Sequence, residues 1–281
     1  LKVIHIQRLA MGSDSKQPTY VLVDGSSYLF RAYYALPDLR NSKGEATGAI
    51  RGVISMIKKL EKDFPESLVV VVFDAPGRTF RDELFEDYKA NRSSTPDDLK
   101  EQIQPIKDLV VAMGFPLICM EGVEADDVIG TYSLMAGDAG QTVLISTGDK
   151  DMAQLVNQSV TLVNTMTETM MDRNGVIEKF AVPPELIIDY LALMGDTVDN
   201  IPGVPKVGPK TAAKWLNEFG SLESLIDRAA EIKGKVGENL RNSLEQLPLS
   251  KALTTIKTDV EVPISLKDLK RDPADRDLLL K

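Results

Sequence analysis

The sequence is poor in the residues that build disulfide, zinc and histidine sites. Its 281 residues include one cysteine, Cys119, and one histidine, His5. A lone cysteine excludes a disulfide framework and a cysteine-rich zinc site, and it is typical of a reducing compartment. We expect Cys119, which stands in an apolar run, to lie in the core. A single histidine argues against catalysis by a histidine dyad or triad and against metal binding by several histidines.

The sequence also lacks long hydrophobic runs and a signal peptide. Its longest apolar runs, such as 68–73, are far shorter than the roughly 20 residues that cross a bilayer. No apolar segment followed by a small-residue cleavage site stands at the N-terminus. We therefore expect a cytoplasmic protein that does not bind a membrane. Residues 1–18 show no clear period, and we interpret them as a tag-derived or disordered extension.

Short apolar runs alternate with helical patterns as far as Leu193. Strands are expected over 20–23, 68–73, 116–120, 142–146 and 160–163. Apolar residues recur at helical spacing over 50–60 and 99–110. This alternation predicts an α/β fold with a central, mostly parallel sheet flanked by helices. Beyond Leu193 we expect only short helices, over 211–219, 221–230, 236–247 and 249–255, so we predict a core over 19–195 and a helical domain over 196–281.

The segment 75–97 does not fit a simple connection between a strand and a helix. It is polar, and it interleaves basic residues with Phe80, Phe85 and Tyr88. A stretch of this length and charge is more often a functional excursion than a connector.

Acidic residues follow three of the expected strands. Asp24 and Asp74 come directly after two of them, and Asp149 and Asp151 follow a third. In an open parallel sheet the carboxyl ends of the strands meet at one edge, where ligands bind. Bringing like charges together costs free energy unless cations lie between them. The alternative is that each acid on its own is a helix cap or a turn residue.

Two further acidic groups have helical spacing. Glu124, Asp126 and Asp127 stand near an expected helix start, and Asp196 is three residues from Asp199. With the strand-end acids, these groups offer oxygen ligands only, which suit Mg²⁺ or Mn²⁺. So many carboxylates favour a two-metal site for phosphoryl displacement. The alternative is a solvated set of charges at a helix N-terminus.

The segment 201–212 combines glycines, prolines and lysines. Gly203 and Gly208 are five apart, and Lys206 and Lys210 lie close by. Glycines allow close approach to a phosphate, and a helix N-terminus binds anions. The segment is similar to a helix-hairpin-helix element that holds a DNA backbone without reading its sequence. The alternative is an ordinary turn between helices. Because the net charge is -9, DNA would have to bind at local basic surfaces and not at the surface as a whole.

The acidic motifs and the hairpin stand in the order found in the flap endonuclease family. The matching runs are 23–27, 73–75, 122–127, 146–151 and 194–203. From about residue 19 onward, the chain closely resembles the 5′-nuclease domain of bacterial DNA polymerase I. The resemblance implies a PIN-like core with a helical arch at about 75–97 and a C-terminal helix-hairpin-helix (helix-3-turn-helix) domain. It also implies a metal-dependent 5′–3′ exonuclease and flap endonuclease for primer and flap removal in DNA replication and repair.

The resemblance also assigns the site residues. Ligands for two or more Mg²⁺ or Mn²⁺ ions would be Asp24, Asp74, Glu124, Asp126, Asp127, Asp149, Asp151, Asp196 and Asp199. Lys89, Arg92 and Arg31 would stabilise charge at the scissile phosphate. DNA would be bound by Phe30, Arg78, Arg81, Tyr88, Gly203, Val204, Lys206, Gly208, Lys210 and Thr211, with K⁺ held by main-chain carbonyls of the hairpin. For Phe30 and Tyr88 the alternative to base stacking is core packing.

The expected partners are DNA with 5′ flaps, nicks or RNA primers. Because the segment 256–280 resembles the passage toward a polymerase, we interpret the chain as a monomeric piece of a larger polymerase. A stand-alone 5′–3′ exonuclease is the alternative, and a non-catalytic junction binder is the other. A phosphatase of the haloacid dehalogenase type is disfavoured, because that family has a second aspartate two residues after the first.

Overall fold

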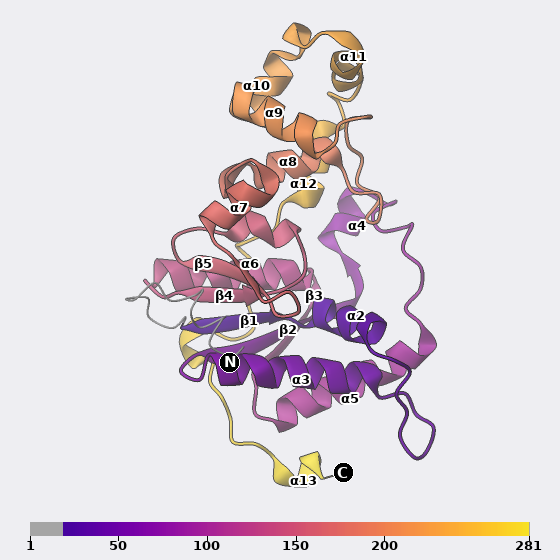
Figure 1. The fold of residues 1–281 in the computed structure, drawn as a ribbon, viewed down its shortest axis with the longest axis vertical. Helices are drawn as coiled ribbons and strands as arrows, with labels where there is room; N and C mark the ends of the chain where they lie inside the picture. Colours follow the sequence, from indigo (N-terminus) through magenta and orange to yellow (C-terminus); the bar gives the residue numbers. More distant parts are fainter. Residues whose placement is uncertain (1–18, 281) are drawn as a thin grey trace.

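The computed structural model describes residues 19–280, and the N-terminal extension, His5 included, lies outside them. Six strands form one sheet in the order β3-β2-β1-β4-β5-β6, shown in Figure 1. The strands are β1 (Tyr20–Asp24), β2 (Leu68–Thr79), β3 (Leu117–Gly122), β4 (Val143–Ser146), β5 (Val160–Asn164) and β6 (Thr169–Met171). Neighbouring strands are parallel except β5 and β6. The five expected strands and the mostly parallel sheet are confirmed.

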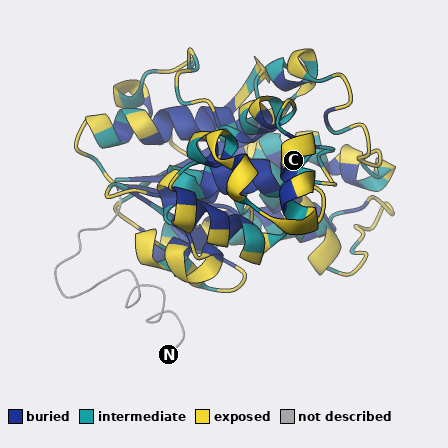
Figure 2. Cartoon of the chain, turned by 90° about the horizontal axis from the view of Figure 1, so that it is seen from above, coloured by how far each residue is buried: buried dark blue, intermediate teal, exposed yellow. Residues whose placement is uncertain are grey.

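Helices cover both faces of the sheet because the side chains of each strand alternate between them. On β1, Val21 and Val23 pack into the core beneath α2 (Gly25–Ala35), α3 (Gly48–Asp63) and α5 (Asp97–Ala112). Tyr20 and Leu22 pack on the opposite face, with α6 (Ala125–Asp138). Figures 1 and 2 show these layers and the buried residues between them.

Between β6 and residue 280 the chain forms helices joined by loops, and the sequence predicts four short helices there, all beyond Leu193. Its helices are α7 (Arg173–Phe180), α8 (Ile187–Met194), α9 (Pro209–Phe219), α10 (Leu222–Asp227), α11 (Gly234–Asn242), α12 (Leu247–Thr254) and the short α13 (Arg276–Leu279). The helix expected over 221–230 is interrupted after Asp227. Beyond α12 the chain returns along the sheet domain to its far end (Figure 1), where the N–H of Asp272 donates to the carbonyl of Gly114. No helix within residues 19–280 is long and apolar enough to cross a membrane.

Cys119 is exposed, contrary to the expectation that it lies in the core. It belongs to β3, the edge strand of the sheet, where Ile118 points into the core and Cys119 to the other side. Its Sγ lies 3.3 Å from the carbonyl oxygen of Asp74. The apolar run therefore indicated the strand correctly, but the burial of each side chain depends on what covers that edge.

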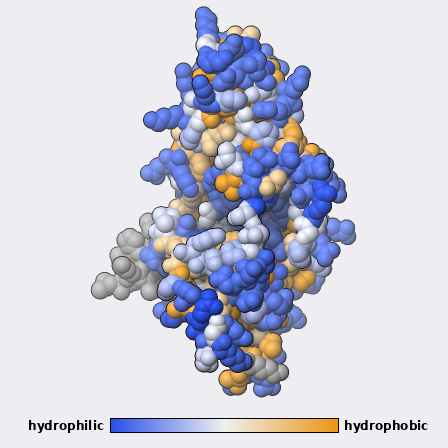
Figure 3. All heavy atoms as spheres, turned by 90° about the vertical axis from the view of Figure 1, so that its right-hand side faces the viewer, coloured by the Kyte–Doolittle hydropathy of each residue, from blue (hydrophilic) through white to orange (hydrophobic). Residues whose placement is uncertain are grey.

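We call the segment 75–97 the excursion. It begins within β2 and leads away from the sheet. β2 extends to Thr79, and the short α4 (Phe80–Leu84) follows, with Asp82 and Thr79 forming a capping box at its start. Turns then lead from Phe85 to α5. The face of the molecule on this side is mostly hydrophilic, with scattered apolar patches (Figure 3).

Candidate active site

An acid-lined cavity of about 480 Å³ opens at the carboxyl ends of the parallel strands. Eight of the nine acids predicted as ligands line it: Asp24, Asp74, Glu124, Asp126, Asp149, Asp151, Asp196 and Asp199. They come from the end of β1, the middle of β2, the turns after β4, the start of α6, and the loop after α8. Parallel strands carry their acids to the same edge of the sheet, so segments far apart in sequence meet here.

The carboxylates are held by neighbouring hydrogen-bond donors. Asp24 caps α2 by accepting from the N–H of Ser27 at 2.8 Å, and it accepts from Thr147 Oγ1 at 2.7 Å. Asp74 accepts from the N–H of Ala125, the first residue of α6, at 2.8 Å. The alternative interpretation, in which the acid is a helix cap, is thus correct for Asp24. Capping does not prevent Asp24 from also binding a metal, because an ionised carboxylate offers about four acceptor positions.

The cavity concentrates negative charge that has little solvent to stabilise it. Burial raises the pKa of Asp24 to about 7, helped by the neighbouring Asp74 and Asp149. Burial and the charge of Asp149 likewise raise the pKa of Asp151 to about 7, and burial with nearby acids raises the pKa of Asp126 well above its usual range. Oδ1 of Asp151 is buried and has no hydrogen-bond partner. An oxygen-only donor set with an unpaired buried carboxylate oxygen fits divalent cations.

Basic side chains partly neutralise the acids. Lys89 contacts Glu124, and Arg92 Nε donates to Asp199 at 2.8 Å. Lys150 Nζ lies 2.9 Å from Asp196. Sequence reasoning did not select Lys150, although its place between two acids could have indicated it. Repulsion and these ion pairs hold the acids apart, and among residues 19–280 no three are already gathered tightly enough to coordinate one ion.

Arg31 and Phe30 both line the cavity. Arg31 Nη2 donates to Asn164 Oδ1 at 2.7 Å, whereas its Nη1 is buried without a hydrogen-bond partner. An unpaired guanidinium nitrogen beside an acidic cavity is available to an anion. The ring of Phe30 is 38% exposed, so the core-packing alternative does not describe it. Arg78 is also exposed, at the end of β2.

Three of the predicted site residues are buried outside the cavity, which corrects their assignment. Asp127 is fully buried, and both its oxygens accept from Arg81, at 2.7 and 2.8 Å. Arg81 is 2% exposed, so it cannot reach a DNA strand. Tyr88 is 6% exposed and packs with Ile201 and Leu253, which matches the core-packing alternative. The side chain of Asp127 points to the inner side of α6 and holds a guanidinium instead of a metal.

The hairpin segment lies between α8 and α9, next to the excursion. Lys206 and Lys210 are exposed, Thr211 is partly buried, and Val204 is buried, so only the main chain of Val204 can meet a ligand. Residues of this segment and of the excursion, Phe85 among them, line a shared hollow of about 740 Å³. A ligand backbone can therefore reach the hairpin and the acid-lined cavity from one side.

Gly203 and Gly208 of the hairpin segment differ in how closely other atoms surround them. Substituting each glycine by alanine should therefore change the stability of the protein to different extents. A Cβ on Gly203 would lie 2.3 Å from the carbonyl oxygen of Met194, whereas one on Gly208 would meet nothing within 4 Å. We expect Gly203→Ala to lower the free energy of unfolding by about 1–3 kcal/mol through overpacking. Gly208→Ala should leave it unchanged within about 0.5 kcal/mol. Urea unfolding of both variants measures this, and equal stabilities would contradict it.

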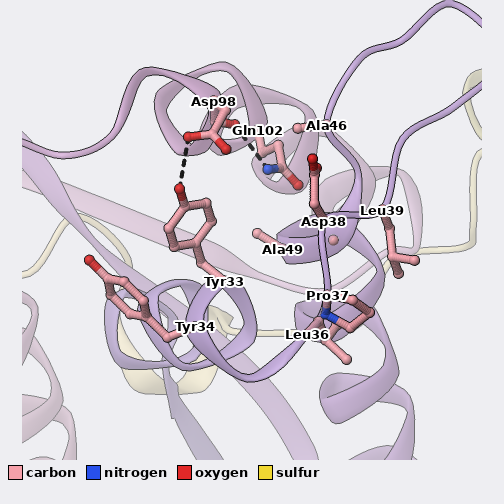
Figure 4. Close-up of a pocket in the computed structure, with 11 residues that line it drawn as sticks. Tyr33, Tyr34, Leu36, Pro37, Asp38, Leu39, Ala46, Ala49, Asp98 and Gln102 are labelled. Carbon is pink, nitrogen blue, oxygen red and sulfur yellow. Dashed lines mark hydrogen bonds between the residues drawn. The ribbon is translucent and has the colours of Figure 1, made fainter.

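A second hollow, of about 340 Å³, lies between the end of α2 and the start of α5 (Figure 4). Tyr33 points toward Asp98 and donates to its Oδ1 at 2.9 Å. Tyr34 and Asp38 also line the hollow, and none of the lining residues is basic. Sequence reasoning did not predict it, and it does not extend the basic surface around the acid-lined cavity.

Comparison with known proteins identifies the family. A model described as the 5′–3′ exonuclease N-terminal resolvase-like domain matches residues 19–181, and one described as the 5′–3′ exonuclease C-terminal SAM fold matches 182–277. The 5′–3′ exonuclease of Buchnera aphidicola subsp. Baizongia pistaciae is 44% identical, over 92% of this chain and 88% of its own. The chain belongs to the 5′–3′ exonuclease family. The two family models meet between residues 181 and 182. The domain boundary that we predict from the sequence, between residues 195 and 196, stays a prediction.

Other members of the family extend the comparison. DNA polymerase I of Pseudomonas aeruginosa is 54% identical over 94% of this chain, which spans 30% of that relative's length. A bacteriophage T5 D15 flap endonuclease variant, solved with DNA and metal ions, is 27% identical, with a TM-score of 0.72 over 93% of this chain and 98% of its own. Membership makes the chain a nuclease of the 5′–3′ exonuclease type, with a resolvase-like core and a C-terminal SAM fold.

Proposed function

We propose that the chain is a structure-specific 5′ nuclease that hydrolyses phosphodiesters near junctions of single strand and duplex. Its substrates would be DNA with 5′ flaps, nicks or RNA primers, met during replication and repair in the bacterial cytoplasm at the nucleoid. The observation that carries this proposal is the cavity in which eight acids face Arg31, Lys89 and Arg92. Acids alone would repel a phosphodiester, and basic residues alone would bind it without cleaving it.

The eight cavity acids would hold two or more Mg²⁺ or Mn²⁺ ions. One group would be Asp24, Asp74, Glu124 and Asp126, and the other Asp149, Asp151, Asp196 and Asp199. When bound, divalent ions supply an activated water and neutralise the charge on the attacking and leaving oxygens. The chain's own contribution is to fix the carboxylates through donors such as Thr147 and the N–H of Ala125.

The basic residues would orient the scissile phosphate. Lys89 and Arg92 are paired with Glu124 and Asp199, and a phosphodiester that enters the cavity competes for them. If bound cations took over the charges of Glu124 and Asp199, the two basic side chains would be free to orient the phosphate and to stabilise its developing charge. The unpaired Nη1 of Arg31, which also lines the cavity, offers a third donor.

The hairpin would hold the duplex backbone. Gly208 is open, and α9 begins after it at Pro209, which has no N–H, so the N–H of Lys210 is the first that this helix offers to an anion at its N-terminus. Lys206 and Lys210 add positive charge, and the main-chain carbonyls of 203–208 would take the K⁺.

We further propose that a polymerase follows in the native chain and that the protein is a monomer. A stand-alone 5′–3′ exonuclease is the second candidate, because the Buchnera relative matches over 88% of its length.

Cleavage of a 5′-end-labelled double-flap DNA tests the proposal. With Mg²⁺ we expect cuts near the flap junction, and with EDTA we expect the cutting to stop while the protein stays folded. Removing the metal eliminates the activated water and leaves the acids unneutralised. Binding of the flap DNA without cleavage in either Mg²⁺ or Mn²⁺ would contradict the nuclease proposal and would indicate a junction-binding protein.

A further inference from the structure

The stretch Leu253–Lys257 comprises the last two residues of α12 and the start of the chain that leads back to the sheet domain. We call it the return segment. Three side chains from separate elements bind it. Arg81 donates to the carbonyls of Leu253 and Thr255 at 3.0 and 2.8 Å. Asp127 accepts from the N–H of Lys257 at 2.9 Å. Gln154 donates to the carbonyl of Thr254 at 3.0 Å and accepts from the N–H of Ile256 at 2.9 Å.

Each of these three anchors also bonds to a cavity acid or to its main chain. Gln154, in the 3₁₀ helix η1 (Asp151–Leu155), donates to the carbonyl of Asp151 at 3.0 Å. Arg81 Nη1 lies 3.1 Å from Glu124 Oε2. Asp127 Oδ2 accepts from the N–H of Glu124 at 3.0 Å. A single side chain, bonded at both ends, thus links the return segment to each group of proposed ligands.

The return segment is pressed against α6. A Cβ on Gly130 would lie 2.7 Å from Cγ2 of Ile256 and 3.0 Å from the carbonyl oxygen of Lys257. Ile256 is 6% exposed and belongs to the main hydrophobic core. The hydrogen bonds of Arg81 to Leu253 and Asp127 are buried here, which makes their geometry costly to change.

The preceding helix joins the return segment to the hairpin. Gln246 donates to the carbonyl of Gly203 at 3.0 Å, and Ser250 Oγ donates to that of Pro202 at 2.5 Å. Leu253, at the end of α12, packs against Tyr88 of the excursion and against Ile201. One continuous stretch of chain therefore contacts the hairpin, the excursion and the two acid-bearing elements.

We propose that the return segment sets the spacing of the metal ligands, and that Gln154, Arg81 and Asp127 are positioning residues for the cavity acids. The inference rests on the proposed function of that cavity. Mutual repulsion drives η1 and α6 apart, and the three anchors tie both elements to one segment of main chain. Groups that orient metal ligands from outside the coordination sphere typically change metal affinity or activity by about 10–100-fold when they are removed.

Gln154→Met tests this, because methionine keeps the volume and removes every hydrogen bond. Gln158→Met is the matched control, since Gln158 is exposed. We expect Gln154→Met to weaken binding of Mn²⁺ to the DNA-free protein by about 10-fold, measured by electron paramagnetic resonance of free Mn²⁺. The Mg²⁺ concentration for half-maximal single-turnover cleavage should rise in parallel, and binding of the flap DNA in EDTA should stay within about twofold. Gln158→Met should match the wild type.

Wild-type Mn²⁺ affinity and Mg²⁺ dependence in a folded Gln154→Met variant would overturn the inference. If that variant fails to fold, Gly130→Ala displaces the return segment without removing any polar group, and the same weakening of Mn²⁺ binding is expected. Wild-type metal affinity in Gly130→Ala would then overturn the inference. Failure of the wild type itself to cleave would refute the proposed function instead, and the Mn²⁺ comparison distinguishes the two failures.

Discussion

Asp126→Asn is expected to slow single-turnover flap cleavage on the order of 10³-fold, because it removes one of the carboxylates that would hold the metal charge at the reacting phosphate. The same substitution should raise the melting temperature of the metal-free protein. Burial and neighbouring acids raise the pKa of Asp126 well above its usual range. A carboxyl whose pKa is higher in the folded than in the unfolded state destabilises the fold at neutral pH, where the unfolded chain carries the charge freely.

Thermal unfolding in EDTA and with added Mg²⁺ measures both effects. In EDTA the variant should melt above the wild type. Added Mg²⁺ should raise the melting temperature of the wild type more than that of the variant, since a ligand stabilises the state it binds. Cleavage near the wild-type rate would contradict a ligand role for Asp126. An unchanged melting temperature in EDTA would contradict the prediction that the buried charge of Asp126 destabilises the metal-free fold.

Asp127→Asn, one residue further along the chain, is expected to have the opposite effect on stability. Asp127 is fully buried, and both its oxygens pair with Arg81. Removing one partner of a buried ion pair leaves the other charge uncompensated, and the free energy of unfolding should fall by about 3–5 kcal/mol. The pair is also bonded to the main chain at Leu253, Thr255 and Lys257, so the arginine has no route to solvent.

Urea unfolding of Asp127→Asn, with Asp138→Asn as the control, checks this prediction. Asp138 is an exposed acid on the same helix, and its substitution should change stability by less than about 0.5 kcal/mol. If Asp127→Asn unfolds at the same urea concentration as the wild type, the buried pair contributes little. A variant as stable as wild type but unable to cleave would show that Asp127 acts in the reaction and not in stabilising the fold.

Much of the architecture could be predicted from the sequence because it depends on local periodicity. Apolar runs of strand length, separated by helical patterns, are sufficient to predict five parallel strands. The antiparallel β6 (Thr169–Met171) was missed, because three residues with no alternation carry no such pattern. The acids at the ends of the apolar strand runs were likewise sufficient to predict that Asp24, Asp74 and Asp149 share one cavity, although β2 continues past Asp74 to Thr79.

Which member of a local group faces the cavity could not be predicted in this way. Asp126 and Asp127 are adjacent and chemically identical, yet about 100° of helical rotation separates their side chains. One lines the cavity and the other lies against Arg81. Phe30 stands in an aromatic-rich run and Tyr88 in a charged one, yet only Tyr88 is covered by residues from the hairpin and α12.

The sequence by itself determined the α/β core, the helical C-terminal part, the order of the acidic motifs and the family they resemble, because each depends on residue types at short spacing. The tertiary structure alone decided which side chains are solvent-exposed. The buried Arg81–Asp127 pair and the anchoring by Gln154 both involve the return segment, about 100 to 175 residues away along the chain. Contacts over such separations leave no local period, since burial depends on how distant elements pack together.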